Sequence, residues 1–321
     1  MARSTRSIPP AVSLSLASAL WGIATVISKA VLASVPPITF LVIQLIPSVC
    51  ALWMLLAMTR ARSETWRGLL PLALLGLLNP GLAYTLSMLG LVETTASVAT
   101  LLWAAEPALI VVTAWLLLRE TITLRFLAAT AAAACGVLLV SGGVGGGRVL
   151  SASSYGAALI LGGVFCCALY TVLSRRIAST IDPLQAVAVQ QTAGLAWVVA
   201  IWPLEPQGEA IGSLAALSSK ELLGAALSGL MYYGAAFWFY LNALRSVPAT
   251  TASIFLNLTP VFGVAAAYVF LGERLTASQW LGAAMILLSV LALLTWAAAP
   301  RAHATSGGRG GSCGRRPWLK T

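Results

Sequence analysis

Two stretches of the chain follow one pattern: ATLLWAAEPALIVVTAWLLLRE at residues 99–120 and ASIFLNLTPVFGVAAAYVFLGE at residues 252–273. Each is predominantly apolar, has a proline at its ninth position and ends on a glutamate. A run of about 20 apolar residues is long enough to cross the hydrocarbon core of a bilayer as a helix. The two stretches therefore predict two related membrane spans, each with a proline inside it.

The composition of the whole chain points the same way. Of its 321 residues, 59% are hydrophobic and 9% are charged, against roughly 25% charged in a soluble domain. So few charges cannot cover the surface of a soluble protein of this size. We therefore predict an all-α integral membrane protein. Its ten transmembrane helices are expected near residues 12–32, 38–58, 69–89, 94–118, 123–141, 155–175, 183–203, 221–243, 249–271 and 277–297.

Several chemical classes are disfavoured by what the sequence lacks. Its single histidine, His303, lies in a polar tail, which argues against histidine-based metal sites and catalytic triads. The five cysteines show no CxxC spacing. The glycine-rich stretch 142–147 lacks the Lys-Ser/Thr ending of a phosphate loop, so we expect no ATP site. We therefore expect neither a metal nor a cofactor, and a gradient as the source of any energy.

The distribution of lysine and arginine predicts the orientation in the membrane. If the N-terminus is cytoplasmic, fifteen of the 19 basic residues fall in cytoplasmic segments, and four fall outside. This bias follows the positive-inside rule. The net charge of +10 then reflects orientation in the bilayer, and we expect no nucleic-acid partner. The prediction is a multi-pass protein of the cytoplasmic (inner) membrane with both termini in the cytoplasm.

An internal repeat divides the chain into two halves of five predicted spans. The matched pairs are Gly76 and Gly229, Gly81 and Gly234, Pro107 and Pro260, and Glu120 and Glu273 at an offset of 153, and Ser28 and Ser174, Pro37 and Pro183, and Gln44 and Gln190 at an offset of 146. Because five is odd, the second copy must cross the membrane upside down. Such inverted repeats are typical of secondary transporters, with the substrate site near the midplane.

The repeat also sets the predicted domain boundaries. We expect a first five-helix repeat at residues 11–141, a glycine-rich linker at 142–154, a second five-helix repeat at 155–297 and a basic disordered tail at 298–321.

These two halves, each with a proline in the fourth span and a glutamate at its end, resemble the EamA domains of the drug/metabolite transporter (DMT) superfamily. The resemblance covers residues 11–297. It implies a ten-helix bundle with a central cavity lined by helices 1–4 and 6–9. Helices 5 and 10 would be peripheral and able to support a homodimer. One departure is that Glu106 precedes the proline of the first copy, where Thr259 precedes that of the second.

Glu106 is the acidic residue that falls in the middle of a predicted span, because the other eight fall in loops or at span ends. A carboxyl at this depth is costly unless it faces a cavity or a partner. We interpret it as a proton-coupling group or as a partner for a substrate amine. A structural hydrogen bond to a neighbouring helix is the alternative.

The repeated prolines and glutamates are expected to shape the cavity and its gates. Pro107 and Pro260 each remove one backbone hydrogen bond and kink their spans. Glu120 and Glu273 match the helix-end acid of the family, and the inverted repeat places them on opposite sides of the membrane. We expect them to contact neighbouring arginines at a fold or gate contact; a solvated helix-end charge is an equal alternative.

Polar and aromatic side chains inside the spans are the other candidates for the substrate pathway. Hydrogen bonding between helices is the commoner use of such amides. Besides Glu106, the predicted pocket residues are the amides Gln44, Asn79, Gln190 and Asn257 and the aromatics Trp21, Tyr84, Trp103, Tyr170 and Tyr240.

Small residues in the fifth predicted span favour close helix packing. Ala132 and Gly136 have small-xxx-small spacing, which lets two helix backbones approach. We expect this face to contact another helix, within the bundle or in a dimer.

These observations favour a secondary transporter, and not an enzyme, that moves small amino-acid-like or drug-like metabolites by alternating access. Export is the favoured direction, with a proton as the coupling ion. A lipid-carrier flippase-like or accessory membrane protein of the same fold is the alternative. An intramembrane enzyme would need at least two catalytic groups at mid-depth, where the sequence offers one carboxyl. A channel is disfavoured because inverted repeats with broken helices suit rocking around a closed site.

Overall fold

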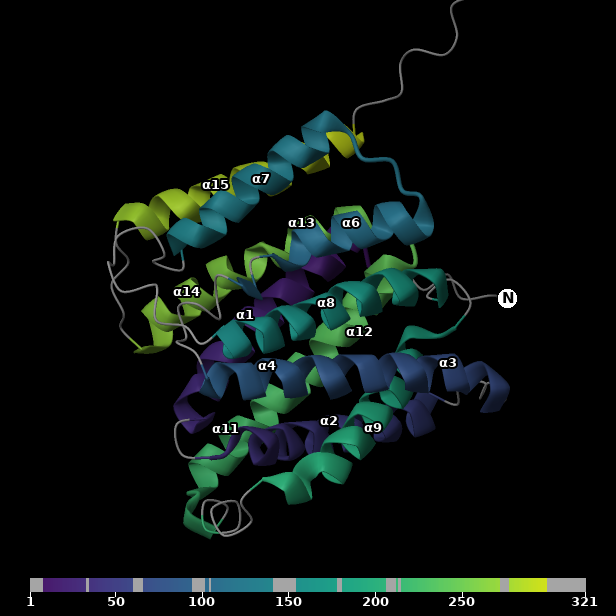
Figure 1. Ribbon diagram of the computed structural model, residues 1–321, viewed down its shortest axis with the longest axis vertical. Helices are drawn as coiled ribbons and strands as arrows, with labels where there is room; N and C mark the ends of the chain where they lie inside the picture. The colour runs from purple at the N-terminus through teal and green to yellow at the C-terminus, as the bar shows by residue number, and fades with distance from the viewer. Residues whose placement is uncertain are drawn as a thin grey trace, which may run out of the picture.

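The described part of the chain is a bundle of roughly parallel and antiparallel helices (Figure 1). The computed structural model describes residues 8–32, 35–59, 66–93, 102–103, 105–140, 154–177, 181–205, 212, 215–271 and 277–298. All regular secondary structure within these residues is helical. Of the predicted features, Glu273, residues 142–153 of the linker and residues 299–321 of the tail lie outside the described residues.

The helices follow the order of the predicted spans. In the first half they are α1 (Pro10–Leu32), α2 (Pro37–Thr59), α3 (Trp66–Gly76), the π-helix η1 (Leu77–Leu82), α4 (Ala83–Val92), α6 (Glu106–Leu118) and α7 (Leu124–Val140). In the second half they are α8 (Ser154–Ile177), α9 (Pro183–Ile201), the 3₁₀ turn η2 (Trp202–Leu204), α11 (Ser219–Gly229), the π-helix η3 (Leu230–Ala236), α12 (Phe237–Leu244), α13 (Ala249–Leu256), α14 (Leu258–Leu271) and α15 (Ala277–Ala298).

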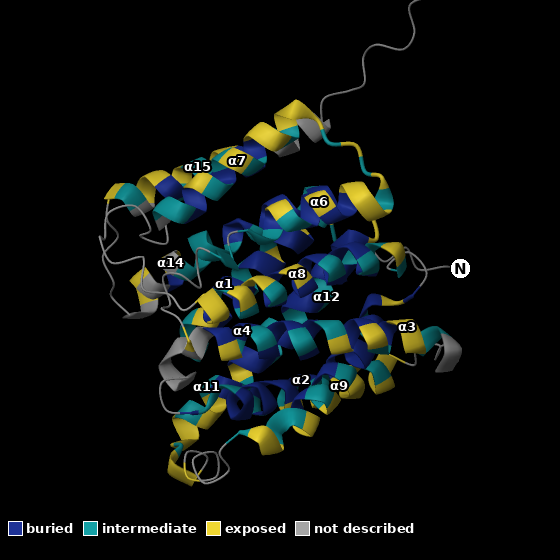
Figure 2. Ribbon diagram, viewed as in Figure 1, coloured by how far each residue is buried: buried dark blue, intermediate teal, exposed yellow. Residues whose placement is uncertain are grey.

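The surface of the bundle is that of a membrane protein. Within the described residues, six helical stretches are long and apolar enough to span a bilayer, and three shorter apolar helices accompany them. Large apolar side chains such as Met58, Trp115 and Leu288 are more than half exposed on the outer faces. Figure 2 shows the buried residues on the inward faces of the helices. Lipid can cover such an apolar exterior, whereas water cannot do so without cost.

Besides the span that contains Glu106, three of the predicted spans are interrupted in the structure. The span predicted at 69–89 contains η1, where the Asn79 backbone leaves the helix (φ −148°, ψ 118°) directly before Pro80. A proline disfavours helical geometry in the residue before it, which accounts for this break. The span at 221–243 contains η3 at the repeat-related position, and the span at 249–271 is divided at Asn257 into α13 and α14.

Two glycines allow helices to cross in backbone contact. A Cβ atom on Gly76 of α3 would lie 2.1 Å from the carbonyl oxygen of Gln190 in α9. A Cβ atom on Gly229 of α11 would lie 2.1 Å from the carbonyl oxygen of Gln44 in α2. Gly76 and Gly229 are a matched pair in the sequence repeat, and so are Gln190 and Gln44. The two crossings are therefore equivalent: in each, a glycine of one half lies against the backbone of a glutamine in the other half.

Helices α7 and α15 pack side by side at one edge of the bundle (Figure 1). A Cβ atom on Gly136 would lie 2.7 Å from the carbonyl oxygen of Gly282, so these backbones touch. Ala129 and Ala133 on the same helix are buried. The expected contact of the small-residue face is confirmed, and its partner is a helix of the same chain.

Candidate functional site

The predicted aromatic residues lie in one cluster at the centre of the bundle. Trp21 of α1 lies 5.4 Å from Tyr240 of α12, measured between ring centroids, and Tyr84 of α4 stacks on Trp103 at 6.1 Å. Tyr170 of α8 reaches the same cluster through Phe237, at 5.8 Å. The residues that join these pairs are Tyr232, Tyr233 and Phe237 of the η3–α12 segment.

The linking residue Tyr232 was missing from the predicted pocket, although it contacts three other rings of the cluster. Its hydroxyl accepts a hydrogen bond from the Tyr84 hydroxyl at 3.1 Å, and its carbonyl accepts one from Trp21 Nε1 at 3.1 Å. The density of aromatics in residues 232–240 pointed to this segment. It could not rank the residues, because the π-helix changes which side chains face inward.

Glu106 lies beside this cluster, in the first turn of α6. The residue is half-buried, and its carboxyl lies within electrostatic range of the Cys167, Tyr232 and Tyr240 side chains. None of the residues that the structure describes forms a hydrogen bond or an ion pair with this carboxyl. Glu106 is therefore the first residue of a helix and not the middle of one, since a turn at Ala105 precedes α6 directly before the kink predicted at Pro107. An acidic group in a first helical turn interacts favourably with the helix dipole.

The helix breaks coincide with the repeated prolines. Pro107 lies at the start of α6, and Pro260 lies in the first turn of α14, which begins at Leu258. Asn257, the residue between α13 and α14, is 3% exposed, and its side-chain nitrogen has no hydrogen-bond partner among the described residues. Pro260 therefore marks the beginning of a second half-helix inside a predicted span, and Pro107 marks the beginning of α6. Transporters with broken helices bind substrate at such positions.

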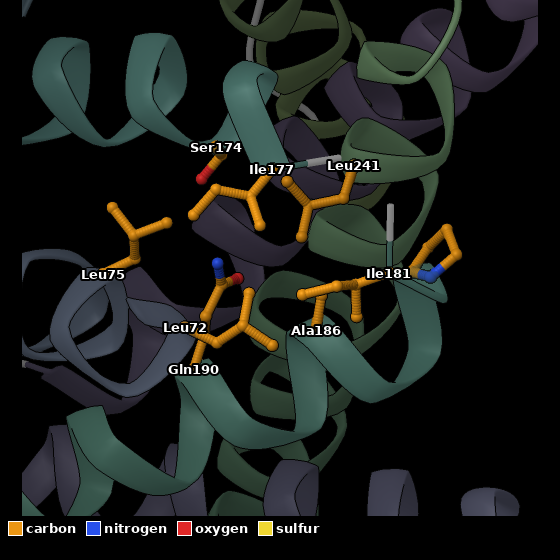
Figure 3. A pocket seen from close by; sticks show the side chains of 9 residues that line it. Leu72, Leu75, Ser174, Ile177, Ile181, Ala186, Gln190 and Leu241 are labelled. Carbon is orange, nitrogen blue, oxygen red and sulfur yellow. The ribbon is translucent and has the colours of Figure 1, made fainter. Parts of the chain in front are cut away.

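The remaining predicted amides have different surroundings. Asn79 donates from Nδ2 to Cys167 Sγ at 3.2 Å, while its buried Oδ1 has no partner among the described residues. Gln44 donates from Nε2 to the hydroxyls of Ser28 and Ser228, both at 2.9 Å. Gln190 Oε1 accepts from the Tyr170 hydroxyl at 2.8 Å. Gln190 also lines a small cavity of about 10 Å³ between α3, α8, α9 and α12 (Figure 3).

Glu120 caps a distant helix. Its carboxylate accepts hydrogen bonds from the backbone N–H groups of Ala249 and Thr250 at 2.9 and 3.0 Å, and from the Thr250 hydroxyl at 2.6 Å. Glu120 thus makes a fold contact, and its partner is the start of α13. Arg119, which was expected to contact Glu120, instead turns the chain with a left-handed backbone (φ 53°).

Glu205 makes the same arrangement at the start of α2, although the sequence placed it in a loop. Its carboxylate accepts from the N–H groups of Ile38 and Thr39 at 2.9 and 2.8 Å, and from the Thr39 hydroxyl at 2.6 Å. A shared sequence signal was present, because Thr39 and Thr250 each stand two residues after a proline at a helix start. The N–H groups of a first helical turn require an acceptor.

A comparison with family models now identifies the chain. A model described as the EamA-like transporter family matches it twice, over residues 9–142 and 154–295. The chain belongs to the EamA-like transporter family. EamA-like proteins are part of the DMT superfamily, so this chain is a multi-pass membrane transporter.

The relatives of this EamA-like chain carry transporter names. The chain is 28% identical over 297 residues to the uncharacterized transporter YvbV of Bacillus subtilis, covering 89% of this chain and 91% of that protein. It is 25% identical to an uncharacterized transporter of Archaeoglobus fulgidus, covering 70% and 77%. It is 28% identical to a "Probable terminal-alkyne amino-acid exporter" of Streptantibioticus cattleyicolor, covering 68% and 71%.

A solved structure shares the fold of this EamA-like chain. One crystal structure superposes with a TM-score of 0.75 at 16% sequence identity, covering 90% of this chain and 99% of that one. At this identity the similarity concerns the arrangement of helices.

Proposed function

We propose that this EamA-like protein exports small amine-bearing molecules, amino-acid-like or drug-like, across the cytoplasmic membrane by alternating access. The observation that carries the proposal is Glu106, a half-buried carboxyl beside the aromatic cluster with no hydrogen-bonding or ionic partner among the described residues. A carboxyl inside a membrane protein needs a counter-charge or a proton. A substrate ammonium group supplies the first, and a coupling ion supplies the second.

The aromatic cluster suits the same substrate class. Trp and Tyr rings attract a cation over their faces, by roughly 0.5–2 kcal/mol depending on desolvation. Trp103, Tyr232 and Tyr240 all belong to the cluster beside Glu106. The name of the Streptantibioticus cattleyicolor relative, an amino-acid exporter, supports an amine-bearing substrate and the outward direction.

For the architecture we infer ten helices in two inverted five-helix repeats, with both termini in the cytoplasm. The double match of the family model supports two copies of one unit. The reciprocal crossings of Gly76 with Gln190 and of Gly229 with Gln44 support a twofold relation between them. Helix ends that carry Arg175, Arg176 and Arg245 gather at one end of the bundle, which supports a cytoplasmic location for that end.

The proposed cycle exchanges a proton for substrate at Glu106. When the path is open to the cytoplasm, the carboxylate binds the substrate ammonium; when it is open outward, a proton replaces the substrate. When the substrate is a zwitterionic amino acid, each exchange moves one net positive charge inward, which contributes about 2.3 kcal/mol for each 100 mV of membrane potential; exchange for a monocationic amine is electroneutral and is driven by the pH gradient. The loosened backbone next to Pro107 gives water and substrate access to the carboxyl.

The test is Glu106→Gln, which keeps the side-chain shape but removes the ionisable group. Purified protein in vesicles loaded with L-propargylglycine, a terminal-alkyne amino acid, and an internal pH dye is diluted into buffer that lacks the amino acid. We expect the unsubstituted protein to acidify the lumen as substrate leaves, and Glu106→Gln to abolish this acidification. The proposal is wrong if Glu106→Gln acidifies the lumen at the unsubstituted rate, or if the unsubstituted protein moves no protons.

Glu93→Gln is the matched control. Glu93 is exposed at the end of α4, away from the aromatic cluster. We expect this variant to retain proton-coupled efflux, which separates the role of the Glu106 site from a general loss of charge.

A further inference from the structure

The two repeat-related glutamines of the bundle differ in their hydrogen bonding. In what we call the Gln44 cluster, Gln44 Nε2 donates to Ser28 Oγ and to Ser228 Oγ, so α1, α2 and α11 are joined. The repeat positions of Gln44 and Ser28 are Gln190 and Ser174, and Leu75 replaces Ser228. The same three positions therefore exist at the other end of the bundle, with one hydroxyl fewer.

The matching positions are separated by the cavity, which we call the Gln190 pocket. It is lined by Leu72, Leu75, Ser174, Ile177, Ile181, Pro183, Ala186, Gln190 and Leu241. Figure 3 shows the Ser174 hydroxyl and the Gln190 amide on facing walls, pointing into it. Ser174 is 2% exposed, and its hydroxyl lies near that of Tyr170 but forms no hydrogen bond of normal geometry with a described residue.

The Gln190 amide is already arranged for the missing bond. Its Oε1 accepts from Tyr170, which leaves Nε2, the same atom that Gln44 uses, to donate. A buried hydroxyl without a partner is unfavourable. A small approach of α8 to α9 would satisfy Ser174 and close the pocket without breaking the bond to Tyr170.

The end that holds the Gln44 cluster is also sealed by further contacts. Glu205 and Trp202, where α9 ends, both bond Thr39 at the start of α2. Val35, the repeat counterpart of Ile181, packs with Phe40 and Ala225 in a small apolar core. Ile181, by contrast, lines the pocket.

We propose that the Gln44 cluster and the Gln190–Ser174 pair are the two gates of the transport path, and that the structure has the first hydrogen-bonded and the second unbonded. The inference rests on the alternating access of the proposed function and assigns its gates to named side chains. The unbonded gate lies at the end that carries Arg175 and Arg245, which the positive-inside rule assigns to the cytoplasm. Outward opening breaks two hydrogen bonds at Gln44 and forms one at Gln190.

The test uses the matched positions Ile181 and Val35, which are similarly buried, at 8% and 6% exposure. Each is replaced by cysteine in a background without the five native cysteines, and the rate of reaction with N-ethylmaleimide is measured in vesicles without substrate. We expect Ile181→Cys to react at least about tenfold faster than Val35→Cys. Adding Gln44→Leu should raise the Val35→Cys rate by about tenfold, the effect of losing two neutral hydrogen bonds, and lower the Ile181→Cys rate.

Two further variants guard against misfolding. Ser228→Ala removes one acceptor with little change in shape, and should shift both rates in the same directions by a smaller factor. Gln190→Leu should leave Ile181→Cys reactive, because its gate is already without the hydrogen bond that would hold it closed. Equal rates at Val35→Cys and Ile181→Cys, or rates unchanged by both Gln44→Leu and Ser228→Ala, would overturn the proposal. Because no substrate or pH gradient is used, the result is independent of the Glu106 experiment.

Discussion

At the scale of single residues, carboxylates hold helix starts that are remote in sequence. Glu120 supplies both oxygens to the first N–H groups and the threonine hydroxyl of α13, and Glu205 does the same for α2. Hydrogen bonds to a charged acceptor are stronger than neutral ones. Since the capped N–H groups have no partner within their own helix, these contacts fix the ends of elements that must stay together near the membrane surface.

Replacing Glu120 by alanine should therefore destabilise the protein. We expect a loss of about 2 kcal/mol in the free energy of unfolding, since three charge-assisted bonds are lost together and water replaces part of their effect. Thr250→Val removes the hydroxyl bond alone and should cost about 1 kcal/mol. Denaturant titration in detergent micelles measures both values; an unchanged midpoint for Glu120→Ala would mean that the capping contact contributes nothing to stability.

At the scale of helices, glycine sets where the two halves can touch. Gly76 and Gly229 bring helix backbones into contact at Gln190 and Gln44, and Gly136 does the same between α7 and α15. Small residues permit this approach in membrane proteins, where dispersion contacts and hydrogen bonds drive helix association. The π-helices η1 and η3 follow directly after Gly76 and Gly229, so each crossing precedes an irregular turn.

Gly76→Ala should push α3 and α9 apart where they cross. The added Cβ would stand 2.1 Å from a backbone carbonyl oxygen that cannot move alone, so we expect a loss of about 2–3 kcal/mol in unfolding free energy. Gly162→Ala is the control, because its nearest neighbour would lie 3.5 Å away. That variant should be neutral or slightly stabilising, since alanine favours helices. Equal unfolding midpoints for the two alanine variants would contradict the assigned role of Gly76.

The sequence was sufficient for the helical membrane fold and for the aromatic cluster, and insufficient for the partners of individual side chains. Apolar runs and repeated residues depend on local patterns, and all five predicted aromatics lie together in the structure. Tyr232 and Glu205 were missed because their roles depend on a π-helix register and on a partner 166 residues away. The break before Glu106 was predicted only as a kink at Pro107 for the same reason: proline predicts a kink, and tertiary packing decides where the helix restarts.

At the scale of the whole molecule, the two ends of the bundle differ in charge. Arg175 and Arg176 at the end of α8 donate to the carbonyls of Arg245 and Leu117, which ties the ends of α12 and α6 to the same side. The opposite end carries Glu205 at the start of α2. Basic residues remain on the cytoplasmic side during insertion, so the asymmetry predicts which end faces which compartment.

Cysteine labelling tests this orientation. Ser246 and Lys220 are both exposed, at opposite ends of the bundle. We expect a membrane-impermeant maleimide to label Lys220→Cys in intact cells, and to label Ser246→Cys after the membrane is opened. The reverse pattern would refute the inferred topology, whereas labelling of both positions in intact cells would place both loops outside and exclude the inverted repeat.

The crossings at Gly76 and Gly229 also act as fulcrums. Each is a point where two backbones already touch, so helices cannot slide past one another there and can only tilt. From Gln44 to the end of α2 at Thr59 the lever arm is about 22 Å, at roughly 1.5 Å per residue. A tilt of about 10° then swings that end by about 4 Å, with little displacement at the crossing itself. Small changes in side-chain contacts near the crossing can thus produce large displacements at the ends of the helices, because the two glycines keep the crossing itself in place.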